Sequence, residues 1–340
     1  MRCVSAAFAI LTLLATAADG DVFNMGPGLT SLEMVYVGDP GNATSSATLG
    51  GVDYVYNIGK YEVTNAQYCE FLNAVADADP NGLYNEAMGV WWVRSGGISR
   101  SGESGSYEYT VRENRGNRPA NMISWYDALR FTNWLHNGQR SGKQDATTTE
   151  DGVYRMSWAP DVVRNPDAKY WLPTENEWYK AAYYKGGGTN AGYWDYPTQS
   201  DAPPTGESPP GTDLLNGSIN ARDAYHGYSD PVNYTTEVGA YRAKPSDSAY
   251  GTFDQGGNLS EWTETRTSAF EWPECRVRGS SYSSRGTGSH RIYCGFLHLT
   301  AEFPEVGFRV AGIPEPGSIT LLATATIALL AYAWRRRRVR

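Results

Sequence analysis

The sequence lacks the residue patterns that most directly identify a metal site or a repeat architecture. It contains only 4 cysteines and 4 histidines in 340 residues, and no CxxC or HxxxH spacing occurs among them. A locally encoded zinc or iron site is therefore not indicated. No unit of 20–50 residues recurs along the chain, which argues against a solenoid or propeller.

The chain begins with the pattern of an export signal. Arg2 precedes an apolar run from Val4 to Leu14, and Ala15-Thr16-Ala17 follows as a small-residue cleavage pattern. We predict a secretory signal peptide over residues 1–18. The alternative is a buried N-terminal helix.

The last part of the chain combines three features in a fixed order. A Pro-Glu-Pro triplet begins at residue 314, an uncharged run extends from Ser318 to Trp334, and an arginine-rich tail follows. The run is near the minimum length for crossing a bilayer, and the arginines would keep the end in the cytoplasm. This order resembles a PEP-CTERM sorting signal, which we assign to residues 314–340, with the hydrophobic segment at 318–334.

The resemblance implies export across the inner membrane and anchoring in it before processing. An exosortase-type sorting protease would then remove the tail and leave the protein at the cell surface or in the extracellular matrix. A permanent single-span anchor is the alternative.

Positive charge is too scarce for a nucleic-acid partner. The formal net charge is −8. The residues outside the predicted domain 21–312 include six arginines but only two carboxylates, so the mature domain is more acidic still. Nucleic-acid binding depends on basic side chains that neutralise phosphates, and we expect none here.

Large aromatic side chains and glycine are abundant, whereas methionine is rare. The chain has 11 Trp, 24 Tyr and 37 Gly but only 6 Met. Long regular helices would need more of the strong helix formers. The composition predicts a loop-rich fold held together by buried aromatic rings.

Three short helices are indicated by their capping residues. Each start has a Ser or Thr followed three positions later by an acidic residue or Gln, at Thr64, Ser124 and Thr174. Loops of 30 or more residues separate them, chiefly 77–119 and 195–230. Loops of that length need aromatic packing, a disulfide or a bound metal to hold them.

Six motifs in a fixed order extend over most of the chain between the two ends. They are GKYEVTNAQY (59–68), RPANMISWYDA (118–128), WLPTENEW (171–178), GGNLSEW (256–262), RGSSY (278–282) and GFRV (307–310). This set resembles the formylglycine-generating enzyme family, also called sulfatase-modifying factor. The resemblance implies one α+β domain over residues 21–312, C-type-lectin-like, loop-rich and calcium-stabilised.

The family oxidises a sulfatase cysteine by means of two cysteines that hold copper in the loop after the RGSSY motif. Here the two positions fall on Ser284 and Ser289, and hydroxyls are neither soft copper ligands nor redox groups. We therefore expect no copper. A serine nucleophile would need a base such as His290 or His298, and no GxSxG motif surrounds these serines. Solvated loop residues are the simpler interpretation.

Two calcium sites are implied by the resemblance. The first set consists of Asp254, Glu261 and the carbonyls of Gly257 and Leu259, where glycines let main-chain oxygens turn toward one centre. The second set consists of Asn220, the Ala221 carbonyl, Asp230 and the Val232 carbonyl. Plain turns and capping carboxylates are the alternative for both sets.

Three functions compete. A non-catalytic binding or structural module is favoured because both family cysteines are missing. A formylglycine-forming oxidase would need a shifted cysteine, whereas Cys275 and Cys294 read better as a disulfide pair or as partners of Cys69. A carbohydrate-binding lectin fits the aromatic content, but the sugar-binding triplets EPN and QPD are absent. The predicted ligand is an extracellular polysaccharide or protein.

Overall fold

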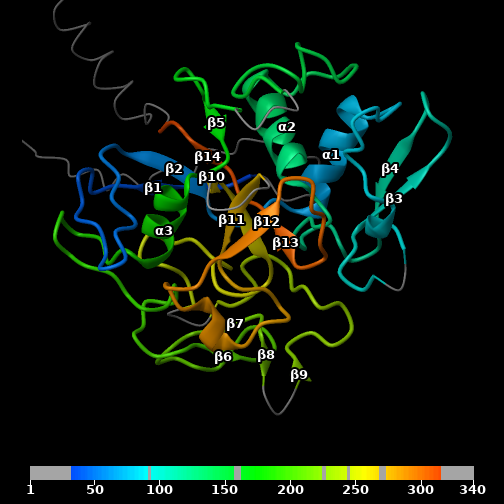
Figure 1. Ribbon diagram of the computed structural model, residues 1–340. Helices are drawn as coiled ribbons and strands as arrows, with labels where there is room; N and C mark the ends of the chain where they lie inside the picture. Colours follow the sequence, from blue (N-terminus) through cyan, green and yellow to red (C-terminus); the bar gives the residue numbers. More distant parts are fainter. Residues whose placement is uncertain are drawn as a thin grey trace, which may run out of the picture. The chain divides into compact units, whose positions relative to one another are not determined.

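Short helices and strands alternate with long loops in the computed structural model (Figure 1), which describes residues 32–90, 93–156, 162–223, 227–242, 246–267 and 273–314. One compact unit runs over Asp21–Ile313. The predicted signal peptide and hydrophobic segment 318–334 lie outside the described residues. Within the described residues, no helix is long and apolar enough to span a bilayer.

All three predicted helices are present, and each begins with a capping box. They are α1 (Asn65–Val75), α2 (Trp125–His136) and α3 (Glu175–Tyr183), capped by Thr64, Ser124 and Thr174. In each box the cap hydroxyl accepts from the backbone N–H three residues on, and that residue's side chain accepts from the cap N–H. The prediction from local sequence is confirmed.

Two four-stranded sheets carry most of the remaining regular structure. The first has the order β1-β2-β14-β5, formed by Met34–Val37, Tyr56–Gly59, Ala311–Gly312 and Tyr170–Trp171. The second has the order β12-β11-β10-β13, formed by Gly295–His298, Glu274–Arg278, Ser260–Thr267 and Val306–Gly307. The first sheet therefore pairs strands from the two ends of the described chain, whereas the second sheet is built from residues 260–307 alone.

Short strands and 3-10 turns occur within the loops. Three two-stranded ladders join β3 with β4, β6 with β7 and β8 with β9, with bounds Ile98–Ser101, Glu108–Val111, Thr205–Gly206, Ser218–Ile219, Arg222–Asp223 and Gly227–Tyr228. Two 3-10 turns are η1 (Glu86–Met88) and η2 (Gly286–Ser289). The fold is thus α+β and loop-rich, as the sequence predicts.

Buried tryptophans tie the loops to the helices and sheets. Trp125, Trp134, Trp178 and Trp262 are all almost fully buried. Three of their indole N–H groups donate to main-chain carbonyls, and that of Trp178 donates to the Glu261 carboxylate. Each indole thereby supplies apolar packing and satisfies a polar group in the interior.

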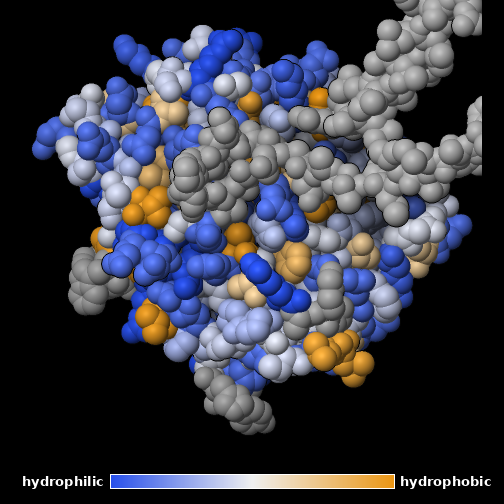
Figure 2. Space-filling model, turned by 180° about the vertical axis from the view of Figure 1, so that it is seen from behind, coloured by the Kyte–Doolittle hydropathy of each residue, from blue (hydrophilic) through white to orange (hydrophobic). Residues whose placement is uncertain are grey.

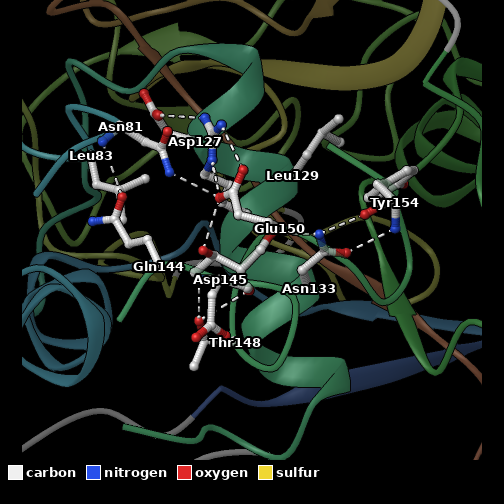
Figure 3. A network of polar contacts seen from close by, with 12 residues as sticks. Asn81, Leu83, Asp127, Leu129, Asn133, Gln144, Asp145, Thr148, Glu150 and Tyr154 are labelled. Atoms are coloured by element: carbon white, nitrogen blue, oxygen red, sulfur yellow. Dashed lines mark hydrogen bonds and ion pairs between the residues drawn. The ribbon is translucent and has the colours of Figure 1, made fainter. Parts of the chain in front are cut away.

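A polar network, shown in Figure 3, holds two of the long loops against α2. Glu150 Oε1 accepts from Arg130 Nε at 2.7 Å and from Asn81 Nδ2 at 3.0 Å. Asn133 Nδ2 donates to the Thr149 and Tyr154 carbonyls, while its Oδ1 accepts from the Tyr154 amide. Charge-assisted hydrogen bonds to Glu150 and amide hydrogen bonds of Asn133 thus help to fix these loops against α2.

Candidate functional site

The loop that follows β11 is closed by one arginine. Arg278 Nε donates to Glu175 Oε1 in α3 at 2.7 Å, and Arg278 Nη1 donates to the carbonyls of Arg291 and Tyr293. Arg276 pairs with the other Glu175 oxygen at 3.0 Å. A single guanidinium therefore joins the two ends of the segment 279–293 to a helix and gives the loop a fixed frame.

The two serines at the family's cysteine positions are engaged with the main chain of this loop. Ser289 is fully buried, and its hydroxyl donates to the Gly286 carbonyl at 2.7 Å. Ser284 Oγ accepts from the Ser281 amide, and its carbonyl accepts from the Arg222 amide at 2.6 Å. Both positions therefore carry hydroxyls that are bonded within the loop.

The described contacts of the His290 ring are with Asp195, Ile292 and aromatic rings, and not with the serines for which it could act as a base. Its Nε2 lies 3.8 Å from Asp195 Oδ2, and its Nδ1 accepts from the Ile292 amide. The ring packs edge-on against Tyr196, with 5.1 Å between ring centroids. No hydrogen bond joins this imidazole to Ser284 or Ser289 among the contacts of the described loop.

The three cysteines of the described chain are free thiols, so the predicted disulfide is wrong. Cys275 lies in β11 opposite Leu297 of β12, and Cys294 lies just before β12 begins. The antiparallel register thus separates two residues that the sequence places around one loop. Burial raises the pKa of the Cys275 thiol strongly and that of Cys69 to about 11, so neither is a ready thiolate.

The first predicted calcium set lies around a buried ion pair. Glu261 Oε2 accepts from Arg309 Nε at 2.6 Å, and Glu261 Oε1 accepts from Arg309 Nη2 at 2.7 Å. Trp178 Nε1 donates to the same Oε2. Glu261 is therefore already fully coordinated by a cation and an indole, and both side chains of the pair have no exposed surface.

Two further carboxylates complete this acidic cluster. Glu62 accepts from the Leu259 amide and from Asn258 Nδ2, each at 2.9 Å. Asp254 Oδ2 accepts from the Gly239 amide at 2.6 Å. Burial raises the pKa of Asp254 to about 6, and burial together with Asp254 and Glu261 raises the pKa of Glu62 well above its ordinary value.

The second predicted calcium set is partly engaged. Asp230 pairs with Arg118 at 3.0 Å and accepts from the amides of Val232 and Asn233. Burial alone would raise the pKa of Asp230, but the Asn233 bonds and Arg118 outweigh it and lower that pKa. The Ala221 carbonyl accepts from Ser229 Oγ.

The donor sets differ in how well they suit a calcium ion. Glu261 is neutralised by Arg309, so the first set does not fit a second, divalent cation at that carboxylate. In the second set, Asn220 Oδ1 is buried without a hydrogen-bond partner, so one oxygen is available to a cation. No cluster of three or more His, Cys, Asp or Glu suited to a metal occurs in the described part of the chain.

Two residues of the acidic cluster lie in the sequence motifs but could not be given a role from the sequence alone. Glu62 lies in the GKYEVTNAQY motif and Arg309 in the GFRV motif. Because they meet Asp254 and Glu261 only through the fold, no spacing along the chain links them. The available signal in the sequence was a charged side chain flanked by apolar or aromatic residues, as at Glu62 and Arg309, because a charge that becomes buried needs a partner.

Comparisons with known proteins agree with this architecture. The model of the sulfatase-modifying factor enzyme 1-like domain matches residues 41–312, and the PEP-CTERM protein-sorting motif matches residues 312–338. The crystal structure of CarF superposes with a TM-score of 0.53 at 21% sequence identity, covering 84% of this chain and 99% of CarF.

Two further solved structures show weaker similarity. Variable protein 1 of Treponema denticola has 19% identity and a TM-score of 0.49, covering 85% of this chain and 98% of its own. PvdO from Pseudomonas aeruginosa has 16% identity and a TM-score of 0.45, covering 84% and 95%. The fold predicted from the six motifs is confirmed as C-type-lectin-like, and the sorting motif indicates export and surface sorting. The chain belongs to the sulfatase-modifying factor enzyme 1-like family and ends in a PEP-CTERM sorting motif.

Proposed function

We propose that this protein is an exported, surface-sorted binding module in which the family's oxidative chemistry is absent. The observation that carries the proposal is the state of the two positions that match the family cysteines. Ser289 is buried and bonded to its own turn, and Ser284 is bonded within the loop. Serine hydroxyls are neither soft ligands nor redox groups, so they cannot replace a pair of copper-binding thiolates.

The remaining thiols supply no substitute pair. Cys69 lies in α1 and Cys275 in β11, and burial holds both in the protonated form. Cys294 contacts Arg276 Nη1 at 3.3 Å but has no cysteine partner. A shifted-cysteine oxidase, the second candidate of this family, therefore lacks two adjacent thiolates.

The test is conversion of a peptide cysteine to formylglycine. The exported chain, purified with its tail in detergent, would be incubated with a Cys-x-Pro-x-Arg peptide, copper and a reductant, and the peptide mass would be followed. We expect no loss of sulfur. A family enzyme that retains both cysteines serves as the positive control, and turnover by this chain at a comparable rate would overturn the proposal.

We also propose that the sorting protease releases the domain from its anchor. The motif over residues 312–338 supports this processing, because it begins where the family domain ends. Immunoblots of membrane and surface fractions should show a shorter, anchor-free form outside the inner membrane. A single full-length form in the membrane would favour a permanent anchor.

A further inference from the structure

Two exposed arginines lie at the ends of a short row of tyrosines. The Arg94 guanidinium carbon lies 5.4 Å from the ring centre of Tyr234, and that of Arg222 lies 5.5 Å from the ring centre of Tyr228. The two rings are 4.6 Å apart and half-buried. We call these four residues the arginine–tyrosine row. Arg222 and Tyr228 belong to β8 and β9, at the bottom of Figure 1.

A guanidinium stacked on a ring is restricted in orientation, but its N–H groups can still bind an oxyanion. No side-chain hydrogen bond of Arg222 occurs among the described residues, whereas Arg94 uses Nη1 for the Pro231 carbonyl and has its other N–H groups left for a ligand. Tyr282 of the RGSSY motif is buried and stacks on Tyr234, with 5.3 Å between the ring centroids. It therefore packs between the row and the interior of the domain. The row is thus joined to the loop that forms the active site elsewhere in the family.

The segment that carries Tyr234 is held by arginines at alternate carbonyls. Arg94 Nη1 donates to the Pro231 carbonyl at 2.6 Å and Arg115 Nη1 to the Asn233 carbonyl at 3.3 Å, while Arg118 Nη1 donates to the Thr235 carbonyl. Tyr234 has φ of 63°, a conformation that side chains other than glycine rarely adopt. Such conformations persist where surroundings enforce them, often at binding sites.

This region has an excess of positive charge in an otherwise acidic protein. Arg115 is buried, and burial together with Arg118 and Arg112 lowers its pKa to about 10. The carboxylates nearby are Asp230, paired with Arg118, Asp223, next to Arg222, and Glu305, beside Tyr282. The chain as a whole has a net charge of −8. A local field of opposite sign attracts anionic partners.

A hydroxyl-rich loop borders the row. The Arg222 amide donates to the Ser284 carbonyl. This bond places residues 281–287, which we call the serine loop, directly beside the exposed end of the row. Ser283, Arg285 and Thr287 are exposed, and Ser283 Oγ lies 2.9 Å from Oγ of the buried Ser281. Hydroxyls can donate and accept, so they pair with the hydroxyls of a sugar as readily as with water.

We propose that the arginine–tyrosine row and the adjoining serine loop bind an acidic polysaccharide through its oxyanion groups. This inference rests on the proposed binding function and names its ligand class. Guanidinium edges recognise carboxylate or sulfate groups, and the exposed hydroxyls of Ser283 and Thr287 recognise the ring hydroxyls between them. Where atoms are coloured, the face of the molecule in Figure 2 carries only small, separated hydrophobic patches.

Affinity electrophoresis of the exported chain, with its tail in detergent, tests the proposal. The probes are polygalacturonate, dextran sulfate and neutral dextran, at low and high NaCl. We expect retardation by one or both acidic polymers, none by dextran, and weaker retardation at high salt because counterions screen the contacts. Polygalacturonate against dextran sulfate distinguishes carboxylate from sulfate recognition.

Matched variants locate the site. Arg94→Gln/Arg222→Gln should weaken binding at least tenfold, whereas Arg155→Gln, at another exposed arginine, should leave it unchanged. Circular dichroism checks that each variant is folded. Because Arg94 also holds the Pro231 carbonyl, Arg222→Gln alone provides a variant whose side chain has no described carbonyl contact, and it should still weaken binding several-fold.

Three results would overturn the proposal. These are no retardation by either acidic polymer, equal binding by the double variant and the parent, and equally tight binding of poly-L-glutamate, which would indicate an acidic peptide. None of these results bears on peptide oxidation. The proposed non-catalytic function fails only if the formylglycine assay shows turnover, so the two failures are distinguishable.

Discussion

At the scale of single residues, Arg309 is the cation on which the buried acidic cluster depends. It binds both oxygens of Glu261 and the carbonyls of Gly59 and Phe253. Removing one partner of a buried pair leaves the other charge uncompensated. We expect Arg309→Met to lower the free energy of unfolding by about 3–5 kcal/mol, measured by urea denaturation.

Two control variants show whether Arg309→Met destabilises the protein by leaving a buried charge unpaired or by losing packing contacts. Lys60→Met removes the partly exposed Lys60–Glu33 pair and should cost only about 0–1 kcal/mol. Arg309→Met/Glu261→Gln should regain much of the loss, since no bare carboxylate remains at that position. A double variant no more stable than Arg309→Met would show that lost packing, not charge, is the cause.

Asp254 gives the cluster a pH dependence. Its folded pKa of about 6 lies above the ordinary value, so the folded state holds the proton more tightly than the unfolded chain. The stabilisation is fully present below the ordinary pKa of aspartate and is lost as the pH rises through about 6. At neutral pH we therefore expect Asp254→Asn to be more stable to unfolding than the parent. This difference in stability should shrink as the pH falls, because Asp254 of the parent then becomes protonated.

Melting temperatures of both proteins between pH 4 and 8 check this prediction. One pKa unit corresponds to roughly 1.4 kcal/mol, so the difference between the curves should be resolved. Curves that run parallel over the whole range would mean that Asp254 titrates normally in the folded protein.

The residue scale also shows where sequence reasoning ends. The family resemblance placed Asp254 and Glu261 in one predicted calcium set, but Arg309 is 48 positions from Glu261 and Glu62 is 197 positions from Leu259. Only the folding of the chain brings these groups together. The predicted calcium role of Glu261 could not be weighed until its cation was known.

At the scale of elements, the capping box of α3 makes a small contribution of its own to the free energy of unfolding. Thr174 Oγ1 accepts from the Glu177 amide at 3.2 Å, and Glu177 Oε2 accepts from the Thr174 amide at 2.6 Å. Thr174→Ala should reduce the free energy of unfolding by about 1 kcal/mol. Thr287→Ala, at an exposed threonine, is the control and should change little. Equal effects of the two substitutions would contradict the cap.

Helices and strands differed in how far they could be predicted. A helix of this fold is encoded within a few residues, so Thr64, Ser124 and Thr174 sufficed to place three of them. A two-residue strand such as β14 exists only because it pairs with β2 and β5, which lie far away in the sequence. The long loops were expected to need a disulfide, aromatic packing or a metal, and hydrogen bonds to Glu150 and Asn133 were not foreseen.

At the scale of the whole molecule, a bound cation would stabilise the fold by mass action. We predict calcium at the second set, where Asn220 Oδ1 lacks a hydrogen-bond partner. A ligand at a hundredfold excess over its Kd adds about 2.7 kcal/mol. Chelation should therefore lower the melting temperature of the parent and of Glu261→Gln, but not that of Asp230→Asn. An unchanged melting curve of the metal-loaded parent after chelation would rule calcium out.

The C-terminal tail should be dispensable for folding. The family domain ends at residue 312, and the sorting motif begins at the same residue. Strand β14, Ala311–Gly312, already completes the first sheet by pairing with β2 and β5. The run from Ser318 to Trp334 has no polar face, so it is unsuited to cover the surface of a soluble domain as an amphipathic helix.

Deletion of residues 314–340 tests this division of the chain. We expect an exported protein that stays in solution without detergent and melts at the same temperature as the full chain in detergent. The detergent must also be added to the truncated protein, so that both curves share one solvent. If the truncated protein aggregates or melts several degrees lower in that solvent, the tail contributes to the stability of the domain. Equal melting temperatures would mean that the tail contributes nothing to the stability of the folded domain.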